Sequence, residues 1–103
     1  MVAAMATIEG PAVGLAEISR LAGEDIEAWL RGYEGYRGLV VFTDEDAQRS
    51  RVVTLWETRE DEERARSGRG AMRDAVAAAS GMEVVAFEVY DVPVFELAKN
   101  ESE

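Results

Sequence analysis

The chain has 103 residues, enough for one domain, and 48% of them are hydrophobic, which excludes wholesale disorder. Acidic residues outnumber basic residues by 21 to 11, and the resulting net charge of −10 disfavours binding to nucleic-acid phosphates. The sequence contains no cysteine and no histidine, which excludes disulfides and thiolate sites and removes the commonest general base and metal ligand.

The N-terminal third of the chain predicts a strand followed by a helix. Alternation from Val2 to Ile8 indicates a strand, which Gly10 and Pro11 end. The apolar residues that follow recur at steps of three and four, typical of one face of an α-helix over residues 11–31: Leu15, Ile18, Ala22, Ile26, Trp29 and Tyr33. Gly23 interrupts this run, so one bent helix or two shorter ones would fit; the unbroken phase favours one.

Two apolar runs in the middle of the chain predict a β-hairpin. Leu39–Phe42 and Val52–Trp56 are rich in β-branched and aromatic residues and are bounded by turn formers. The stretch between them, Thr43–Arg51, contains no large apolar residue, and we expect all of it to form a loop in water.

A second helix is predicted after the hairpin. Thr58 and Asp61 have the spacing of a capping box, and Gly81 is a suitable residue to end the helix. Gly68 and Gly70 weaken its middle, where we expect a kink or local mobility.

The last predicted strand, Met82–Val92, is apolar on both faces and is therefore expected to be central in its sheet. The order strand, helix, strand, strand, helix, strand is that of the ferredoxin-like α+β fold, a four-stranded antiparallel sheet with two helices on one face. We expect one such domain over residues 1–98, followed by a frayed tail over residues 99–103.

Alternation along the strands leaves one apolar face of the predicted sheet uncovered. The residues expected to face the helices are Val53, Leu55, Val85, Phe87 and Val89. The residues expected on the other face are Val52, Thr54, Trp56, Val84, Ala86, Glu88 and Tyr90. A single copy would expose a larger apolar patch than monomers usually show, so we expect a homodimer through this face.

The first ten residues carry no basic segment ahead of their short apolar run. No stretch of the sequence approaches the roughly 20 apolar residues of a membrane span. We therefore expect a cytoplasmic protein.

Four segments resemble one known family: YEGYRGLVVFTDED, SRVVTLWETRED, AMRDAVAAASG and MEVVAFEVYDV. Together they are similar to the antibiotic biosynthesis monooxygenase-like, or dimeric α-β barrel, superfamily, with the Trp and the acidic capped helix after it as the most specific feature. The resemblance implies a dimer in which two sheets close a barrel and C-terminal segments, here Val94–Leu97, reach across to the partner.

The resemblance also implies a class of chemistry. The family includes cofactor-independent oxygenases that bind an acidic phenolic intermediate, favour its anion and let the carbanion react with dioxygen without metal, haem or flavin. It also includes haem-degrading enzymes that depend on an Asn, a Trp and a His. This chain has no His, and its one Asn is Asn100, so we reject haem degradation. The anthrone-type enzymes also commonly use an Asn near the substrate, which this chain lacks outside the tail.

The catalytic residues predicted without a cofactor are Glu88, Tyr90 and Arg73. Glu88 lies in apolar surroundings that would raise its pKa toward that of a general base. Tyr90 can hydrogen-bond a phenolic ligand, and the arginine stripe that ends at Arg73 can receive an anion. The predicted ligand-binding residues are Trp56, which carries over from the family as a pocket residue, with Thr54, Tyr36 and Met72.

Each of these residues also has a purely structural interpretation. Trp56 can be a core aromatic, Tyr90 interface filler, and Glu88 an ion-pair partner or a residue at the barrel rim. Arg66, Arg69 and Arg73 can form a solvated helix face paired with Glu62 and Asp74. A non-catalytic dimeric module that binds a small molecule, or a structural protein with a filled barrel, is therefore the alternative function.

Overall fold

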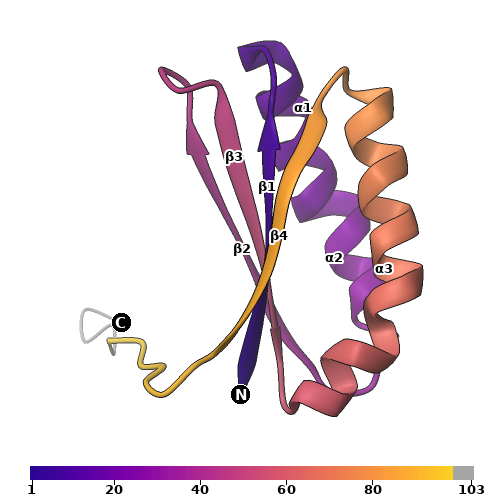
Figure 1. Ribbon diagram of the computed structural model, residues 1–103, viewed down its shortest axis with the longest axis vertical. Coiled ribbons are helices and arrows are strands. Elements are labelled where there is room, and N and C mark those ends of the chain that lie inside the picture. The colour runs from indigo at the N-terminus through magenta and orange to yellow at the C-terminus, as the bar shows by residue number, and fades with distance from the viewer. Residues whose placement is uncertain (99–103) are drawn as a thin grey trace.

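The computed structural model describes residues 1–98, which form a four-stranded antiparallel sheet with helices on one face (Figure 1). The elements in chain order are β1 (Val2–Glu9), α1 (Ala12–Leu21), the π-helical turn η1 (Ala22–Ile26), α2 (Glu27–Leu30), β2 (Tyr36–Asp44), β3 (Arg49–Trp56), α3 (Arg59–Ala79) and β4 (Glu83–Asp91). The sheet order β2-β3-β1-β4 confirms the predicted ferredoxin-like fold. The predicted tail, residues 99–103, lies outside the described residues, as does Asn100.

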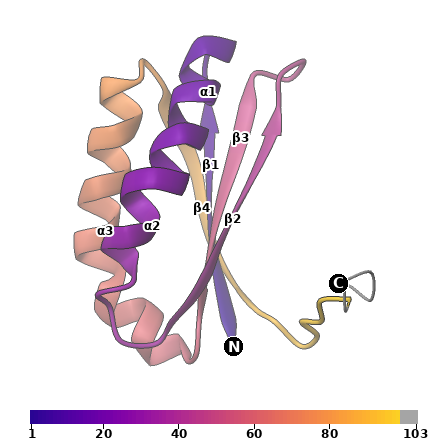
Figure 2. The ribbon, with the colours of Figure 1, turned by 180° about the vertical axis from the view of Figure 1, so that it is seen from behind.

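Only one of the two faces of the sheet is packed against helices. The helices lie together against one face, and no element of residues 1–98 covers the other, as the view from behind shows (Figure 2). Residues 92–98 leave the end of β4 and run away from the helices (Figure 1). None of the helices among the described residues is long and apolar enough to cross a membrane.

The first helical stretch runs without a break from Ala12 to Leu30, as the apolar phase through Gly23 predicted. Its middle, Ala22–Ile26, is a π-helical turn, so one extra residue is accommodated there. Gly23 is exposed within this turn, and a Cβ added to it would meet no atom within 4 Å.

The β-hairpin is longer, and its loop shorter, than predicted. The strands stay paired as far as Asp44 and Arg49, so the loop spans residues 45–48 and not 43–51. A side-chain hydrogen bond from Ser50 to the Phe42 carbonyl at 3.1 Å and a positive φ of 53° at Gln48 support the tight turn. The prediction ended both strands too early because it treated polar residues as loop. The end of a hairpin that is exposed to water can carry polar side chains and still keep its backbone hydrogen bonds.

The predicted cap and end of the second helix are confirmed. Thr58 Oγ1 accepts a hydrogen bond from the Asp61 backbone N–H at 3.1 Å, and Gly81 adopts a φ of +70° after the helix. Helix α3 continues through Gly68 and Gly70 without interruption. Gly68 is explained by a close approach instead, because a Cβ there would lie 2.5 Å from the Tyr33 hydroxyl oxygen.

The prediction that the last strand is central is wrong, because β4 lies at an edge of the sheet and β1 lies inside it. One face of β4 is apolar because it packs against the helices. Its other face is apolar because it forms part of the uncovered face of the sheet. A bulge opposite Thr7 and Ile8 also breaks the alternation within β4. Val84 packs on the helical side as a result, whereas Val85 is exposed.

The predicted orientation of β3 is inverted. Val52, Thr54 and Trp56 face the helices, and Val53 and Leu55 lie on the uncovered face. Phe87 and Val89 face the helices as predicted. The two sets of β3 residues are equally apolar, so alternation separated them correctly but could not tell which set met the helices.

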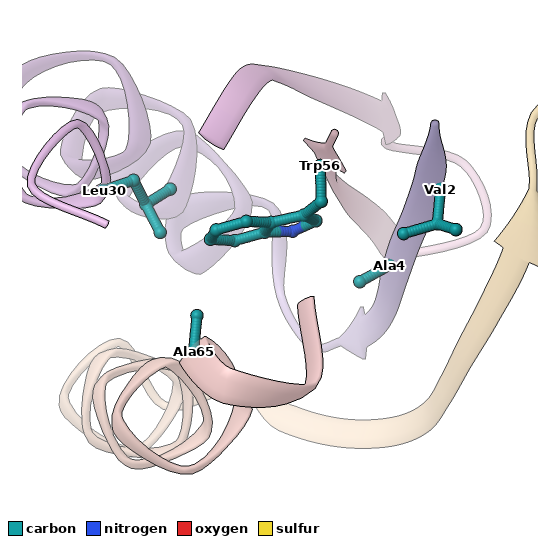
Figure 3. Close-up of a cluster of buried hydrophobic side chains, with 5 residues drawn as sticks. All are labelled: Val2, Ala4, Leu30, Trp56 and Ala65. Atoms are coloured by element: carbon teal, nitrogen blue, oxygen red, sulfur yellow. The ribbon is translucent and has the colours of Figure 1, made fainter. Parts of the chain in front are cut away.

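Trp56 is the centre of the larger of the two core clusters. It is fully buried, and Figure 3 shows it between Leu30 of α2 and Ala65 of α3, with Val2 and Ala4 of the central strand nearby. Two tyrosine rings pack edge-on against it, with centroid distances of 6.3 Å for Tyr33 and 5.8 Å for Tyr36.

Gly35→Ala is expected to lower the free energy of unfolding by about 2 kcal/mol or more. Gly35 has a φ of +83°, and an added Cβ would lie 2.2 Å from Asp61 Oδ2. Urea unfolding measures the effect, and Gly23→Ala is the matched control. Because Gly23 is helical and has open space around it, its replacement is expected to leave stability unchanged or to raise it by up to about 1 kcal/mol. Equal losses for the two variants would contradict this account.

Candidate functional site

A cavity of about 60 Å³ lies between the helices and the covered face of the sheet. Small side chains at Ala4 and Ala6 of the central strand leave this space open. Its lining is apolar except for a few polar groups. The helical residues of the lining are Ile18, Ala22, Ile26, Trp29, Leu30, Arg69, Met72, Arg73 and Val76. The strand residues of the lining are Ala4, Ala6, Ile8, Val52, Thr54 and Phe87. Thr54, Arg69 and Arg73 are the polar exceptions, a composition typical of a small-molecule pocket.

Three arginines of α3 surround one phenylalanine of this lining. The guanidinium carbons of Arg66, Arg69 and Arg73 lie 5.7, 5.8 and 5.1 Å from the centre of the Phe87 ring. Arg69 also lies 5.2 Å from the ring of Trp56 and is only 8% exposed. These are cation–π distances, so the rings hold the positive charges against the cavity wall.

A fully buried carboxylate, Glu62, holds two of these arginines. It forms ion pairs with Arg66 and Arg69, and each pair is hydrogen-bonded. Burial by itself raises the pKa of Glu62, but the hydrogen bonds from Arg66 and Arg69 outweigh it, and the pKa is lowered. Burial lowers the pKa of Arg69, against the opposing effect of Glu62.

The charge balance beside the cavity is positive. One buried carboxylate faces two guanidinium groups, and Arg73 pairs only with the exposed carboxylate of Asp74 at 3.2 Å within residues 1–98. Glu62 was predicted to lie on a solvated helix face. Its spacing of four and seven residues from Arg66 and Arg69 was the available signal, because that spacing places all three on one side of the helix.

Four of the predicted site residues come together here. Thr54, Met72 and Arg73 line the cavity. The Trp56 indole N–H donates to Thr54 Oγ1 at 2.9 Å, which fixes the threonine hydroxyl beside the cavity. Trp56 itself is a fully buried core aromatic that does not line the cavity, and its predicted role in ligand binding stays a prediction.

The fifth, Tyr36, lies in a separate open groove of about 560 Å³ between β2 and the first helical stretch. Its hydroxyl donates to Glu27 Oε2 at 2.7 Å. Burial, followed by this hydrogen bond to Glu27, raises the pKa of Tyr36. Ala22 of the π-helical turn lines both the groove and the cavity.

Glu88 and Tyr90 lie on the uncovered face of β4, across the sheet from Arg73. The Tyr90 hydroxyl donates a hydrogen bond to the Glu88 carboxylate, and this bond raises the pKa of Tyr90. The structure therefore does not bring the three predicted catalytic residues into one site of a single copy.

The cavity lining offers few ligands for a metal or for haem iron. No group of three or more His, Cys, Asp or Glu side chains positioned to hold a metal occurs within residues 1–98. The lining contains no histidine, cysteine or tyrosine, which are common proximal ligands of haem iron. A site for an anion fits the arginine-rich wall better than a site for a cation does.

No protein-family model matches the sequence, and no curated protein matches it closely. Solved structures do match the fold. A candidate antibiotic biosynthesis monooxygenase from Deinococcus radiodurans has 16% identity and a TM-score of 0.68, over 97% of this chain and 100% of that one. The haem-degrading MhuD of Mycobacterium tuberculosis, with two haems in its active site, has 20% identity and a TM-score of 0.67, over 93% and 99%.

A third match is SnoaB of Streptomyces nogalater, a cofactor-independent oxygenase, with 14% identity and a TM-score of 0.62 over 91% of this chain and 94% of that one. At such identities the similarity concerns the fold and not the reaction. The chain therefore shares the fold of these structures, which is the fold that the resemblance of its sequence implied.

Proposed function

We propose that the chain binds a small aromatic anion of the phenolic or quinonoid class in the cavity and oxidises it as a cofactor-independent oxygenase. The observation that carries the proposal is an apolar cavity whose only charged lining residues, within the part of the chain described, are Arg69 and Arg73. Apolar walls suit the ring system, and the guanidinium groups suit a phenolate or enolate oxygen.

The proposed reaction uses the substrate as its own reductant. Loss of a proton from an acidic CH₂ group gives a carbanion whose charge is shared with a ring oxygen, and Arg73 stabilises that charge. The carbanion forms a C–O bond to dioxygen, and the resulting peroxide takes up a proton. Loss of water from the hydroperoxide leaves a carbonyl, so one oxygen atom enters the product and the other becomes water.

The cavity does not supply a general base for this reaction. The cavity lining contains no carboxylate, histidine or tyrosine side chain. The substrate proton therefore goes to water, and the contribution of the protein is to lower the pKa of the substrate through nearby positive charge. Glu88 as a general base remains a prediction that would need a second site on the uncovered sheet face.

Arg73→Met is expected to weaken binding of an anionic phenol about tenfold and to raise the pKa of the bound phenol by about one unit. Methionine keeps an apolar stem against Phe87 but removes the charge. A set of phenolic and quinonoid metabolites is screened by absorbance titration, which reports the phenolate directly, and oxygen uptake is followed for each ligand that binds. Arg59→Met, on the same helix but in an exposed pair with Asp91, is the control. Equal affinities of the wild type and Arg73→Met would contradict the proposal.

The lack of a proton acceptor in the lining also supports the alternative, a module that binds the same ligand without catalysis. The two functions give different results in the same screen. Binding with the arginine dependence above but without oxygen uptake would assign the chain to the alternative. Failure of every ligand to bind would favour a structural protein with a filled core.

We also propose that two copies pack through the uncovered sheet face. The exposed large apolar residues on or beside this face include Val40, Phe42 and Tyr90, and the segment after β4 adds Val94, Phe95 and Leu97. A second copy would remove this surface from water. These residues support the predicted homodimer, although Val53 and Leu55 and not the predicted Val52, Thr54 and Trp56 are the β3 residues on this face.

A further inference from the structure

The uncovered sheet face carries two oppositely charged side chains in its interior. Arg51 lies on β3 opposite Thr7, and Glu88 lies on β4 opposite Met5, on either side of the central strand. Val53 and Leu55 of β3 share the face with them. At the hairpin end of the sheet a separate ion pair joins Glu9 and Arg49 at 2.9 Å.

Neither charge has an ion-pair partner within residues 1–98 of one copy. In the described part of the chain, the charge of Arg51 acts on Tyr90 without forming an ion pair, and Glu88 accepts a hydrogen bond only from the hydroxyl of Tyr90. Both side chains are exposed, so water compensates the charges as long as the face stays open. A partner that covers the face removes this water, and an unpaired buried charge costs several kcal/mol.

A second copy of the chain can meet this requirement by symmetry. A twofold interface is reciprocal. If Arg51 of one copy contacts Glu88 of the second copy, then Glu88 of the first copy contacts Arg51 of the second. A twofold axis that crosses the central strand at the level of Ala6, between Met5 and Thr7, places each Arg51 opposite the partner's Glu88. The face is then self-complementary in charge, and each dimer contains two such pairs.

We propose that Arg51 and Glu88 form two symmetric ion pairs across the dimer and thereby set the register of the two sheets. The hydrogen bond from Tyr90 holds the Glu88 carboxylate in place for this contact. This inference rests on the dimer proposed above and assigns Glu88 and Tyr90 to assembly. The net charge of −10 makes two copies repel at a distance, so a locally balanced face is the favourable place for contact.

A charge swap tests the pairing. Arg51→Glu and Glu88→Arg each place like charges opposite one another twice, and each is expected to raise the dimer dissociation constant about tenfold or more. The double variant restores opposite charges and is expected to return the constant to within about threefold of the wild type. Sedimentation equilibrium at constant salt measures all four proteins. Glu63→Arg, an exposed change of the same size on α3, is the control.

The outcomes separate this inference from the dimer itself. Weakening by both single variants without rescue in the double variant overturns the ion pairs but leaves the face as the interface. A dimer unaffected by either variant overturns the use of this face, and a monomeric wild type at micromolar concentration overturns both proposals. Circular dichroism checks that each variant is folded before its dissociation constant is compared. The neutral variants Arg51→Gln and Glu88→Gln remove each charge without introducing the opposite one.

Discussion

Glu62→Gln is expected to lower the free energy of unfolding at pH 7 by about 3 kcal/mol. The substitution leaves the guanidinium of Arg69, which is 8% exposed, without its buried counter-charge. It also removes the charge-assisted hydrogen bond to Arg66. Urea unfolding at a fixed protein concentration measures the change, and Glu63→Gln, an exposed neighbour on the same helix, is the control with an expected change below about 0.5 kcal/mol.

The same pair of proteins should differ in their response to acid. The pKa of Glu62 is lower in the folded state than its ordinary value of about 4.3, so its contribution to stability is fully present above that value. The contribution is lost as the pH falls through the lowered pKa. The difference between wild type and Glu62→Gln should therefore be largest above about pH 5 and shrink below about pH 4. A difference that stays constant from pH 7 to pH 3 would contradict the buried-carboxylate account.

Trp56→Ala is expected to cost about 3–5 kcal/mol, because it empties the centre of the larger core cluster. It also removes the indole hydrogen bond to Thr54 and the ring over which Arg69 lies. Trp29, the only other tryptophan, is half-buried, and its replacement by alanine is expected to cost clearly less. Equal losses for the two tryptophans would show that Trp56 is not the central packing residue.

A smaller substitution at Trp56 separates packing from the pocket. Trp56→Phe keeps an aromatic ring in the core but has no N–H to donate to Thr54. We expect it to retain most of the stability and to weaken a ligand that depends on the Thr54 hydroxyl. Calorimetric binding beside urea unfolding checks both effects in one protein.

Much of the site was predicted only as a set of residue types. Arg73, Thr54 and Met72 do line one cavity, but Glu88 and Tyr90 lie on the other side of the sheet. They were grouped with Thr54 because alternation predicted all three on one sheet face, and the inverted orientation of β3 puts Thr54 on the opposite face. The role of Glu62 was missed because its burial depends on α3 lying against β4, which local spacing does not reveal.

What the sequence determined by itself was local: the periodicity of the helices and strands, the Thr58 cap, the Gly81 end and, from element order, the ferredoxin-like fold. The periodicity, the cap and the helix end depend on residues two to four positions apart, and the order of elements follows from reading them along the chain. Only the tertiary structure decided that β4 is an edge strand, which face of β3 meets the helices and where the arginines gather. Both faces of β3 and β4 are apolar, so their alternation is compatible with either orientation, and only the packing of the helices on the sheet distinguishes the two.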